Sequence, residues 1–482
     1  MEKLMSVAGQ LRLLTPDQMQ EVHDKACRIL AEKGIVFEAN HSIEVFKANG
    51  FKVEGNTVYF TKEQVEKAVS QVPQEWTFHG VNAAKDVRIA KDAGLVIHPE
   101  GGEVSVQDYK GERRLPTMQD FEQLQILYQA LDNVDIAGYQ PVGPLDKPAR
   151  SRGLWCLYGS WKHTDKPVLP PMEPDTIQKM EEVIHMYEIV HGKDFVANNY
   201  VTWQCLCPNS PWFFANYACD GIKVYAENNQ PVLLVSAPMS GITSPVFLLS
   251  TVVLAIAEDL AGLVLAQLIR PGLPVICSAS LTYGYMRSAS WECASPDTAL
   301  MLASHVQMQR DFYKLPSRAQ TGVTSSKTTD FQAGMETMQS LLYTALAGVN
   351  ITSQTVGSLA NLLTSSLVKT VLDDELIGRV RWMLKGMEVN EEQFGMEDLL
   401  DADPKSAFLE NDSTFDHFRD YFAPSVSDWS NPDEWEEAGS RDVSERAYDK
   451  VTKILAEAPE SLISADLDKE LTDYIKSVEE GA

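Results

Sequence analysis

Several familiar sequence signals are missing from this 482-residue chain, and each absence disfavours a class of protein. No basic start is followed by an apolar run, and the most apolar stretch, near Val246 to Ile269, carries Glu258, Asp259 and Gln267. We therefore expect a soluble protein of the cytoplasm. The seven cysteines are odd in number and lack paired spacing, so we expect reduced thiols.

Cofactor and catalytic motifs are also scarce. No Gly-x-Gly-x-x-Gly follows a predicted strand and no Gly-x-x-x-x-Gly-Lys-Ser/Thr occurs, which disfavours nucleotide cofactors. A Ser-His-Asp hydrolase is discounted because there is no Gly-x-Ser-x-Gly elbow. Cys205-x-Cys207 has no second pair and no His-Glu-x-x-His is present, so we expect no metal site, although Cys219, Cys277 and Cys293 could converge in space.

Basic residues are far fewer than acidic residues, above all near the C-terminus. The chain has 41 Lys and Arg against 68 Asp and Glu, a formal net charge of −27. Residues 386–482 hold 27 acidic and 8 basic residues, so they carry −19 of that total. Such a surface repels phosphate backbones and argues against binding nucleic acid. We expect an acidic helical C-terminal extension that is either a solubilising coat or a docking face.

Residues 1–115 have the pattern of an α+β cap. Thr15-Pro16-Asp17-Gln18 and Thr61-Lys62-Glu63-Gln64 each combine a capping residue with Gln three positions later, which predicts two helix starts. Between Glu75 and Gln107, short alternating runs broken by glycines suit a small antiparallel sheet.

Residues 116–385 alternate short apolar runs with amphipathic helices, which predicts right-handed crossovers and a parallel sheet. Seven strands can be counted, so we predict a TIM (β/α)₈ barrel with one strand unplaced; a doubly wound sheet is the alternative. The predicted strands are Val134–Gly138, Pro167–Leu169, Phe195–Val201, Pro231–Val235, Pro274–Ser278, Ser317–Thr321 and Val349–Thr352. The predicted helices are Ala149–Trp161, Asp175–Val190, Trp212–Glu227, Val246–Leu268, Asp297–Tyr313 and Asp330–Leu346.

In such a barrel the site lies where the strands end, and aromatic, hydroxyl and amide side chains are common at these positions. Tyr and Trp faces can hold a quaternary ammonium by cation–π attraction, and an arginine can hold a carboxylate on the same ligand. For each ring alone, packing between helices is the simpler explanation. The predicted substrate-binding residues are His98, Tyr139, Trp203, Tyr283, Arg287, Arg318, Gln332 and Gln354, with Thr321, Gly322, Ser326 and Lys327 on a loop at the barrel mouth.

The order of several short sequence motifs along the chain resembles that of the trimethylamine methyltransferase family. These motifs include Ala257-Glu258-Asp259-Leu260-Ala261-Gly262, Arg270-Pro271-Gly272-Leu273-Pro274 and Asp373-Asp374-Glu375-Leu376-Ile377-Gly378. The resemblance implies a TIM barrel and methyl transfer from a methylated amine to the cobalt of a corrinoid protein. The family's archetype carries pyrrolysine, whereas this chain has only standard residues, with Thr324 to Lys327 in the corresponding loop.

The chain is therefore similar to the pyrrolysine-lacking branch, which acts on glycine betaine, proline betaine, carnitine or γ-butyrobetaine. The resemblance implies a separate Co(I) corrinoid protein as partner and methyl acceptor, and no tightly bound cofactor. A homo-oligomer is expected for such a barrel, and the acidic charge and the lack of a charge-free apolar run predict no binding to nucleic acid or membranes. No residue is expected to act as acid, base or nucleophile, because a quaternary amine leaves as a neutral tertiary amine. A non-catalytic quaternary-amine binding protein and a zinc-dependent corrinoid methyltransferase remain alternatives.

Overall fold

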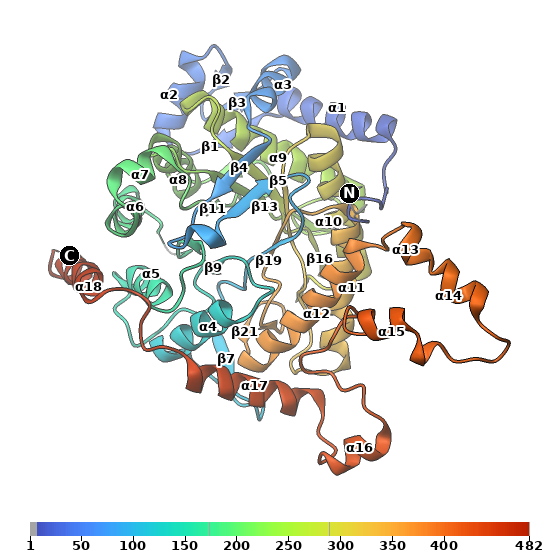
Figure 1. The fold of residues 1–482 in the computed structure, drawn as a ribbon. Helices are drawn as coiled ribbons and strands as arrows, with labels where there is room; N and C mark the ends of the chain where they lie inside the picture. The colour runs from blue at the N-terminus through green and yellow to red at the C-terminus, as the bar shows by residue number, and fades with distance from the viewer. Residues whose placement is uncertain (1–6, 173, 289, 482) are drawn as a thin grey trace.

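A parallel β-sheet surrounded by helices forms the centre of the protein (Figure 1). The computed structural model describes residues 7–172, 174–288 and 290–481. Six strands lie in the order β11, β13, β15, β18, β19, β6, and every neighbouring pair is parallel. They run Gln204–Leu206, Val232–Ser236, Val275–Ala279, Ser317–Gln320, Ile351–Ser353 and Val96–Ile97.

Two more parallel strands, β9 (Ala137–Gly138) and β10 (Val168–Leu169), form a pair beside this sheet. The backbone N–H groups of Asp135 and Ile136, just before β9, both donate to the carbonyl of Ile97 in β6. The pair thus continues the sheet at its β6 edge. An α/β fold built on a parallel sheet, as predicted, is confirmed.

Six of the seven predicted runs overlap a strand of the structure, but the run Phe195–Val201 does not form a strand. Helix α7 occupies Lys193–Asn198, and the strand β11 follows at Gln204–Leu206. Periodicity alone cannot separate a short buried strand from a short helix of the same length, which is why the run was misleading.

The central sheet includes a strand that the sequence pattern did not predict there, β6, which we expected to belong to a small antiparallel sheet. Val96 and Ile97 instead pair in parallel with Ile351 and Thr352 of β19. Two residues are too few to display any periodicity. The antiparallel expectation holds for the hairpin β4 (Glu75–Phe78) and β5 (Val87–Ala90). Its apolar side chains pack against inner-face residues of the sheet at the amino ends of the strands.

The predicted helices are present, with bounds shifted by a few residues. They are α5 (Arg152–His163), α6 (Ile177–His191), α8 (Asn216–Glu227), α9 (Leu248–Ile269), α10 (Pro296–Gln307) and α11 (Phe331–Ala347). Helices α4 (Met118–Ala130) and α12 (Leu367–Lys385) complete the set around the sheet, and a π-helical turn, Met308–Tyr313, extends α10. By length and composition α9 could span a membrane, but 89% of its most apolar window is buried inside the protein.

The N-terminal region packs against α9. Helices α1 (Pro16–Glu32) and α3 (Lys62–Gln71) both begin with the predicted capping boxes, at Thr15 and Thr61. Helix α2 (Asn40–Ala48) lies between them in the chain, and a four-stranded sheet has the order β12, β1, β3, β2. Its strands are Phe213–Phe214, Ile35–Phe37, Thr57–Tyr59 and Lys52–Glu54.

Small sheets extend beyond the carboxyl ends of the central strands. One contains β14 (Met239–Ser240), β16 (Thr282–Tyr285) and β17 (Ser290–Glu292). The other has the order β20, β21, β7, β8, with bounds Ser358–Leu359, Thr364–Ser365, Ser105–Gln107 and Arg113–Arg114.

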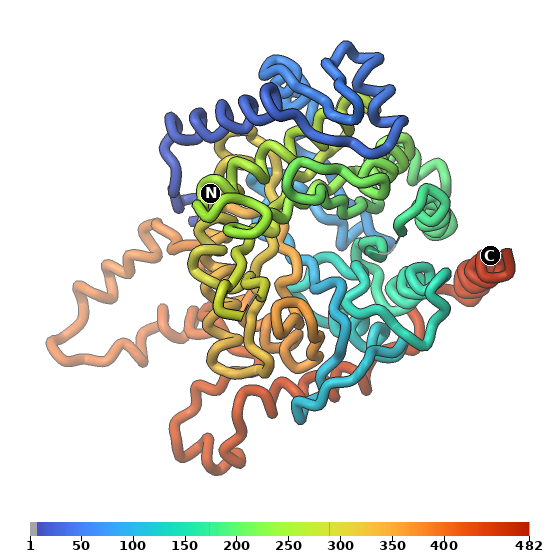
Figure 2. Tube along the Cα trace, turned by 180° about the vertical axis from the view of Figure 1, so that it is seen from behind, coloured from blue at the N-terminus to red at the C-terminus, as the bar shows by residue number. Residues whose placement is uncertain are grey.

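After α12 the chain forms a projecting segment and two docked helices, as Figures 1 and 2 show. The segment contains α13 (Glu391–Phe394), α14 (Met396–Asp401), α15 (Asp412–His417) and α16 (Pro432–Glu437). Helix α17 (Val443–Glu457) packs on α4 and α12 through Ala447 and Val451, and α18 (Ala465–Glu480) packs on α5 and α6. The division into cap, barrel and extension stays a prediction.

A single buried lysine fixes the end of α4 to the start of β9. The Lys166 ammonium donates to the carbonyls of Tyr128, Leu131 and Val134 at 2.5, 2.9 and 2.7 Å. These carbonyls lie at the C-terminal end of α4 and in the connection after it, where no helical N–H remains to pair with them. Lys166 thereby satisfies three buried acceptors at once.

We predict that Lys166→Met lowers the free energy of unfolding by about 2–5 kcal/mol, because three buried carbonyls lose a charged donor while the side-chain length is kept; only Leu131 retains another, from the Val134 N–H. Guanidinium unfolding followed by fluorescence measures the change. The control is Lys25→Met, because the Lys25 side chain is 60% exposed. Equal midpoints for the two variants would contradict a structural role for Lys166.

Candidate active site

A buried arginine lies on the inner face of the sheet near the carboxyl ends of the strands. Arg318 on β18 is register partner to Ser278 on β15, and its Nη1 donates to the Ser278 hydroxyl at 2.9 Å. Its Nε and Nη2 lie 3.3 and 3.2 Å from Nε2 of His98. Arg318 is only 2% exposed, so its fork of donors is fixed inside the protein.

The hydrogen bonds define the protonation of His98. Its Nδ1 is 2.9 Å from the Pro99 carbonyl, which can only accept, so Nδ1 carries the proton and Nε2 accepts from Arg318. Burial and the nearby Arg318 charge lower the His98 pKa well below its usual value. His98 is therefore a neutral acceptor, and the Tyr139 ring meets it edge-on at 4.8 Å.

The Arg318 charge has no carboxylate counter-ion among the residues that the structure describes, since its hydrogen-bond partners are neutral. An isolated buried charge is costly unless an anion compensates it. The arrangement therefore suits a bound anion, and a carboxylate matches the planar guanidinium best.

Two thiols lie near this arginine on β11 and the residue after it. Cys205 and Cys207 have their Sγ atoms 4.0 Å apart, and both residues are partly solvent accessible. A hydrogen bond from Cys207, helped by the Arg318 charge and a hydrogen bond from Tyr139, lowers the pKa of Cys205 to about 6. Cys207 shifts the opposite way, chiefly because its proton is shared with Cys205, and its pKa is well raised.

Sequence reasoning missed two buried carboxyl groups that follow β6. Glu100 and Glu103 are at most 1% exposed; Ser365 donates to Glu100, and Tyr128 lies 3.5 Å from it. Burial raises the pKa of Glu103 to about 8, and burial together with Glu103 raises that of Glu100 well above its usual value. Burial thus favours the protonated, uncharged form of both carboxyls. Their signal was the stretch from Val96 to Glu103, in which we singled out only His98.

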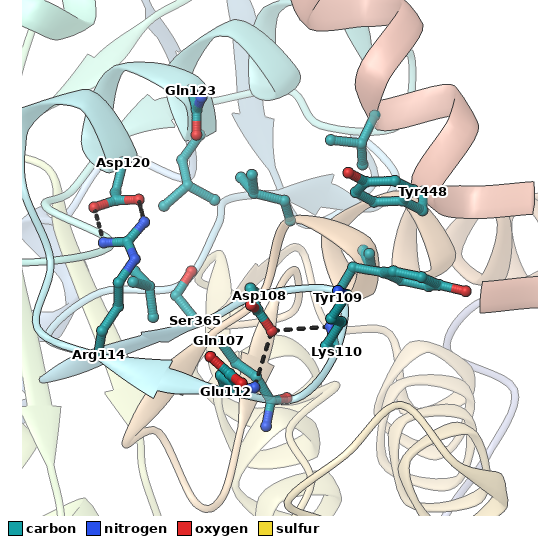
Figure 3. Close-up of a pocket in the computed structure, with 15 residues that line it drawn as sticks. Gln107, Asp108, Tyr109, Lys110, Glu112, Arg114, Asp120, Gln123, Ser365 and Tyr448 are labelled. Carbon is teal, nitrogen blue, oxygen red and sulfur yellow. Dashed lines mark hydrogen bonds and ion pairs between the residues drawn. The ribbon is translucent and has the colours of Figure 1, made fainter. Parts of the chain in front are cut away.

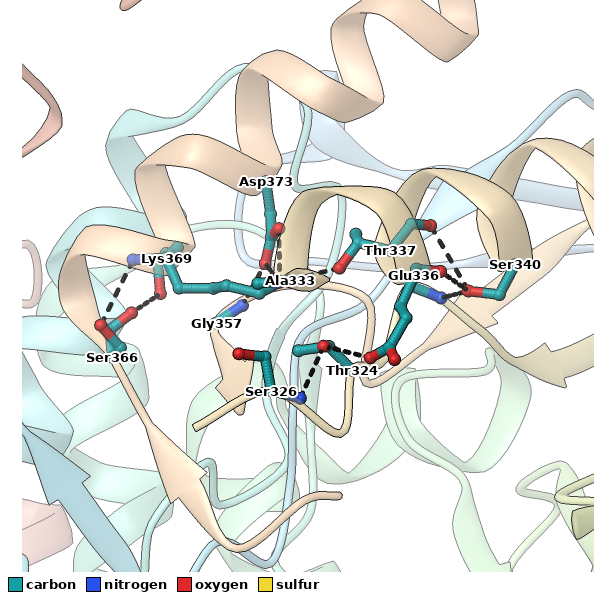
Figure 4. Close-up of polar contacts among 12 residues, drawn as sticks. Thr324, Ser326, Ala333, Glu336, Thr337, Ser340, Gly357, Ser366, Lys369 and Asp373 are labelled. Atoms are coloured by element: carbon teal, nitrogen blue, oxygen red, sulfur yellow. Dashed lines mark hydrogen bonds and ion pairs between the residues drawn. The ribbon is translucent and has the colours of Figure 1, made fainter. Parts of the chain in front are cut away.

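The predicted mouth loop is fixed by hydrogen bonds to α11 (Figure 4). Glu336 accepts from the Thr324 hydroxyl at 2.6 Å and from the Ser325 N–H at 2.8 Å, and the Ser326 hydroxyl donates to Asp330 at 2.8 Å. Gly322 has φ +76°, and a Cβ there would lie 2.7 Å from Thr355, so the position requires glycine.

The other loop residues also have partners within the loop or on α11. The Thr321 hydroxyl lies 3.1 Å from that of Thr344, the Lys327 ammonium donates to the Ser325 carbonyl, and the Gln332 amide donates to Glu336. Lys327 and Gln332 are exposed. The loop is thus a rigid wall, and a contact between its side chains and a ligand stays a prediction.

The remaining predicted site residues are spread more widely. The Gln354 N–H donates to the Pro99 carbonyl, which places Gln354 beside His98. Tyr283 is partly buried on β16, and Arg287 is exposed in the turn between β16 and β17. Trp203 is fully buried, 4.2 Å from the Phe78 ring of the hairpin that covers the amino ends of the strands. The structure therefore groups His98, Tyr139, Arg318 and Gln354, and places Trp203 in the core.

The acidic residues in two of the family-like motifs, on α12 and α9, hold loops in place by accepting hydrogen bonds. Asp373, Asp374 and Glu375 on α12 accept from the backbone N–H groups of Gly357, Asn133 and Val426, respectively. Asp373 also pairs with Lys369, whose Nζ lies 2.6 Å from its carboxylate; Figure 4 shows this pair.

On α9, two adjacent acids act in the same way. Glu258 accepts from the Trp212 N–H at 2.9 Å, while Asp259 accepts from Ser236 at 2.6 Å and contacts His305 at 2.8 Å. Because Ser236 ends β13, Asp259 and His305 hold that strand end in place.

A separate cavity of about 360 Å³ lies between the β7–β8 hairpin and α17 (Figure 3). Arg114 and Asp120 pair with each other there, and Asp108 accepts from the N–H groups of Lys110 and Glu112. Tyr109 stacks on Tyr448 of α17 at 4.4 Å. Most charged groups that line the cavity pair with one another, and the contact between Tyr109 and Tyr448 attaches α17 to the hairpin. This cavity is therefore a weaker candidate for the substrate-binding site than the surroundings of Arg318.

No three His, Cys, Asp or Glu side chains within residues 7–172, 174–288 and 290–481 come together as a metal site. A zinc-dependent mechanism therefore gains no support from the arrangement of the described donors.

The model of the trimethylamine methyltransferase (MTTB) family matches residues 1–481. The chain belongs to this family. Glycine betaine methyltransferase of Desulfitobacterium hafniense (strain Y51) is 34% identical over 97% of this chain and 98% of that protein. L-carnitine:corrinoid methyltransferase of Eubacterium limosum is 25% identical over 82% of each. Trimethylamine methyltransferase MttB of D. hafniense (strain DSM 10664 / DCB-2) is 27% identical over 91% of this chain and 88% of that protein.

These matches show that this MTTB-family chain is a methyltransferase, as the resemblance implied. Among solved structures, Methanosarcina barkeri monomethylamine methyltransferase (MtmB) has a TM-score of 0.54 and 14% identity, with 93% of this chain and 89% of that chain covered. At that identity the likeness supports the fold alone.

We predict that Cys205 of this MTTB-family enzyme reacts with iodoacetamide at neutral pH far faster than an ordinary cysteine. Its pKa of about 6 makes it mostly thiolate at pH 7, and the thiolate is the reactive form. Mass spectrometry of peptides across pH 5–9 gives the labelling rate, with buried Cys293 as internal control. Labelling of Cys205 that begins only above pH 8 would contradict the shifted pKa.

Proposed function

We propose that this methyltransferase moves a methyl group from a carboxylate-bearing quaternary amine to the Co(I) corrinoid of a separate protein. The single observation that carries the proposal is Arg318, a buried cation with neutral partners at the carboxyl ends of the strands. The two relatives named for glycine betaine and L-carnitine lend support, because both of those compounds combine a quaternary ammonium with a carboxylate.

The proposal includes closure of the sheet into a (β/α)₈ barrel. The strands β6, β9, β10, β11, β13, β15, β18 and β19 are eight in number and are connected by helices, as that architecture requires. The carboxyl ends of the strands then form a mouth, with the β4–β5 hairpin at the opposite end. A substrate bound at Arg318 lies below this mouth, through which a corrinoid must approach.

The proposed methyl transfer needs no side chain to act as acid, base or nucleophile. Co(I) supplies the electron pair that forms the Co–C bond, the C–N bond breaks, and its electrons stay on nitrogen as a neutral tertiary amine. No proton moves, so the protein needs to bind, orient and exclude water. Arg318 would hold the substrate carboxylate, with His98 and Ser278 fixing the guanidinium plane. The Tyr139 ring and the Cys205 thiolate are nearby groups that would favour the ammonium end.

The direct test mixes the purified protein with a reduced corrinoid protein and follows loss of the Co(I) absorbance. We expect turnover with one or more of glycine betaine, proline betaine, carnitine and γ-butyrobetaine, and little with trimethylamine. No turnover with any betaine, while the substrate still binds, would favour a binding protein or sensor. Trimethylamine turnover equal to that of every betaine would contradict the substrate class.

We predict that Arg318→Gln raises KM for the carboxylated substrate about 10- to 150-fold, the equivalent of about 1.5–3 kcal/mol for a charge-assisted hydrogen bond. Binding of choline, which lacks the carboxylate, should change far less. Arg28→Gln, on the exposed face of α1, is the matched control and should behave as wild type. A thermal scan checks folding, and Arg318→Lys provides a second variant that keeps the charge. Equal effects on betaine and choline would contradict carboxylate binding.

A further inference from the structure

Cys205 and Cys207 differ from the other cysteines in their access to solvent. Both are partly accessible, whereas the five other thiols of the chain are buried. They lie at positions i and i+2, on β11 and the residue after it, so their side chains point to the same face of the sheet. Both pack against the residues that fill the inner face. The pair is therefore inside the sheet, near Arg318, and within reach of small molecules from solution.

The two sulfur atoms need only a small movement to bond to each other. Their Sγ atoms are 4.0 Å apart, and a disulfide bond is about 2.05 Å long, so the sulfurs have to approach by about 2 Å. Cys207 follows Leu206, the last residue of β11 that pairs with β13, so Cys207 lies outside the strand ladder. Side-chain rotation and a small shift of the backbone after β11 can therefore close the gap without breaking the sheet.

The two thiols also differ in acidity, as a reacting pair requires. The hydrogen bond from Cys207, with the Arg318 charge and a hydrogen bond from Tyr139, lowers the pKa of Cys205 to about 6. The pKa of Cys207 is well raised, chiefly through its hydrogen bond to Cys205. Cys205 is thus the nucleophilic thiolate, and Cys207 is a neutral thiol beside it.

A packing role alone does not explain these properties. Burial raises the pKa of Cys27, Cys277 and Cys293, as expected of cysteines that serve as small apolar side chains. The pKa of Cys205 shifts in the opposite direction, and a second thiol lies next to it. An accessible thiolate beside a second cysteine is typical of thiols that are oxidised reversibly.

We propose that Cys205 and Cys207 form a reversible disulfide that responds to peroxide and stops the enzyme. The Cys205 thiolate attacks one oxygen of hydrogen peroxide, the O–O bond breaks, hydroxide leaves and Cys205 becomes a sulfenic acid. The Cys207 sulfur then attacks the Cys205 sulfur, the S–O bond breaks, and water leaves with the Cys207 proton. Peroxide gains two electrons, and each sulfur loses one. A small dithiol reverses the reaction by thiol–disulfide exchange.

The effect on activity rests on the proposed function, in which the Cys205 thiolate favours the ammonium end of the substrate. A disulfide is neutral, so the ammonium loses this attraction, and Tyr139 loses the thiolate to which it donates a hydrogen bond. We expect substrate affinity to fall about tenfold or more, because opposite charges attract strongly in a site shielded from water. Co(I) is a strong reductant that peroxide also oxidises, so the enzyme would stop under the conditions that remove its methyl acceptor.

The first experiment follows the modification by mass and needs no substrate. The full-length protein is reduced, treated with hydrogen peroxide at neutral pH and digested, and the peptide that carries both cysteines is fragmented. We expect a disulfide between Cys205 and Cys207 before any other cysteine changes, and recovery of both thiols with dithiothreitol. C207S should instead accumulate a sulfenic acid on Cys205 that dimedone traps. C27A, at a buried position on α1, is the matched control and should form the disulfide as wild type does.

Absence of the disulfide, or earlier oxidation of another cysteine, would overturn the proposal. C207A provides a second variant without the resolving thiol, and circular dichroism confirms that each variant is folded.

The second experiment measures betaine binding by calorimetry for the reduced, oxidised and re-reduced protein. We expect affinity about tenfold lower after oxidation and full recovery with dithiothreitol, in wild type and in C27A alike. Peroxide-treated C207S should not recover once its sulfenic acid is oxidised further. Equal affinity of the reduced and disulfide forms would overturn the switch. Reduced protein that binds no betaine would instead contradict the proposed function, and the mass measurement would still decide whether the disulfide forms.

Discussion

Arg318 keeps a positive charge inside the sheet on hydrogen bonds to neutral partners, and the organisation of the candidate site follows from that charge. His98 must be a neutral acceptor with its proton on Nδ1, which the Pro99 carbonyl enforces. A hydrogen bond from Cys207, together with the Arg318 charge, lowers the pKa of the nearby Cys205 thiol and so favours its anion. The thiolate compensates the Arg318 charge only weakly, whereas a substrate carboxylate would pair with the guanidinium through two hydrogen bonds.

The rest of the fold keeps the strand ends in place around that charge. Lys166 fixes the connection from α4 to β9, while Asp259 and Asp373 hold the end of β13 and the turn after β19. Glu336 fastens the loop after β18. Charged side chains thus bind backbone N–H and carbonyl groups at several loops, which makes the site rigid without using residues that face a ligand.

How well the sequence predicts a strand or helix depends on the number of residues in the apolar run that forms it. The parallel sheet and most strands follow from apolar runs of several residues separated by amphipathic helices, and capping boxes place α1 and α3. Strand β6 is missed because two residues show no period, and α7 replaces a predicted strand because a short apolar run fits either structure. Position after a predicted strand selects Tyr139, and the need for a cation selects Arg318; the structure places both beside His98. The sequence cannot reveal that Trp203 lies among hairpin residues or that Glu100 and Glu103 are buried, because both depend on packing between distant segments.

The uncharged state of Glu100 and Glu103 has a consequence for the pH dependence of stability. The formal charge of −27 assumes that every acid is ionised, whereas burial favours the protonated form of these two carboxyls in the native protein. Unfolding exposes both carboxyls and releases their protons, since an unfolded glutamate ionises near its usual pKa of about 4.3. Between that value and the raised native pKa, the folded state binds more protons than the unfolded state. These two groups therefore contribute stability that is fully present in acid and declines as the pH rises, so this pair favours a mildly acidic environment even though the protein as a whole is strongly acidic.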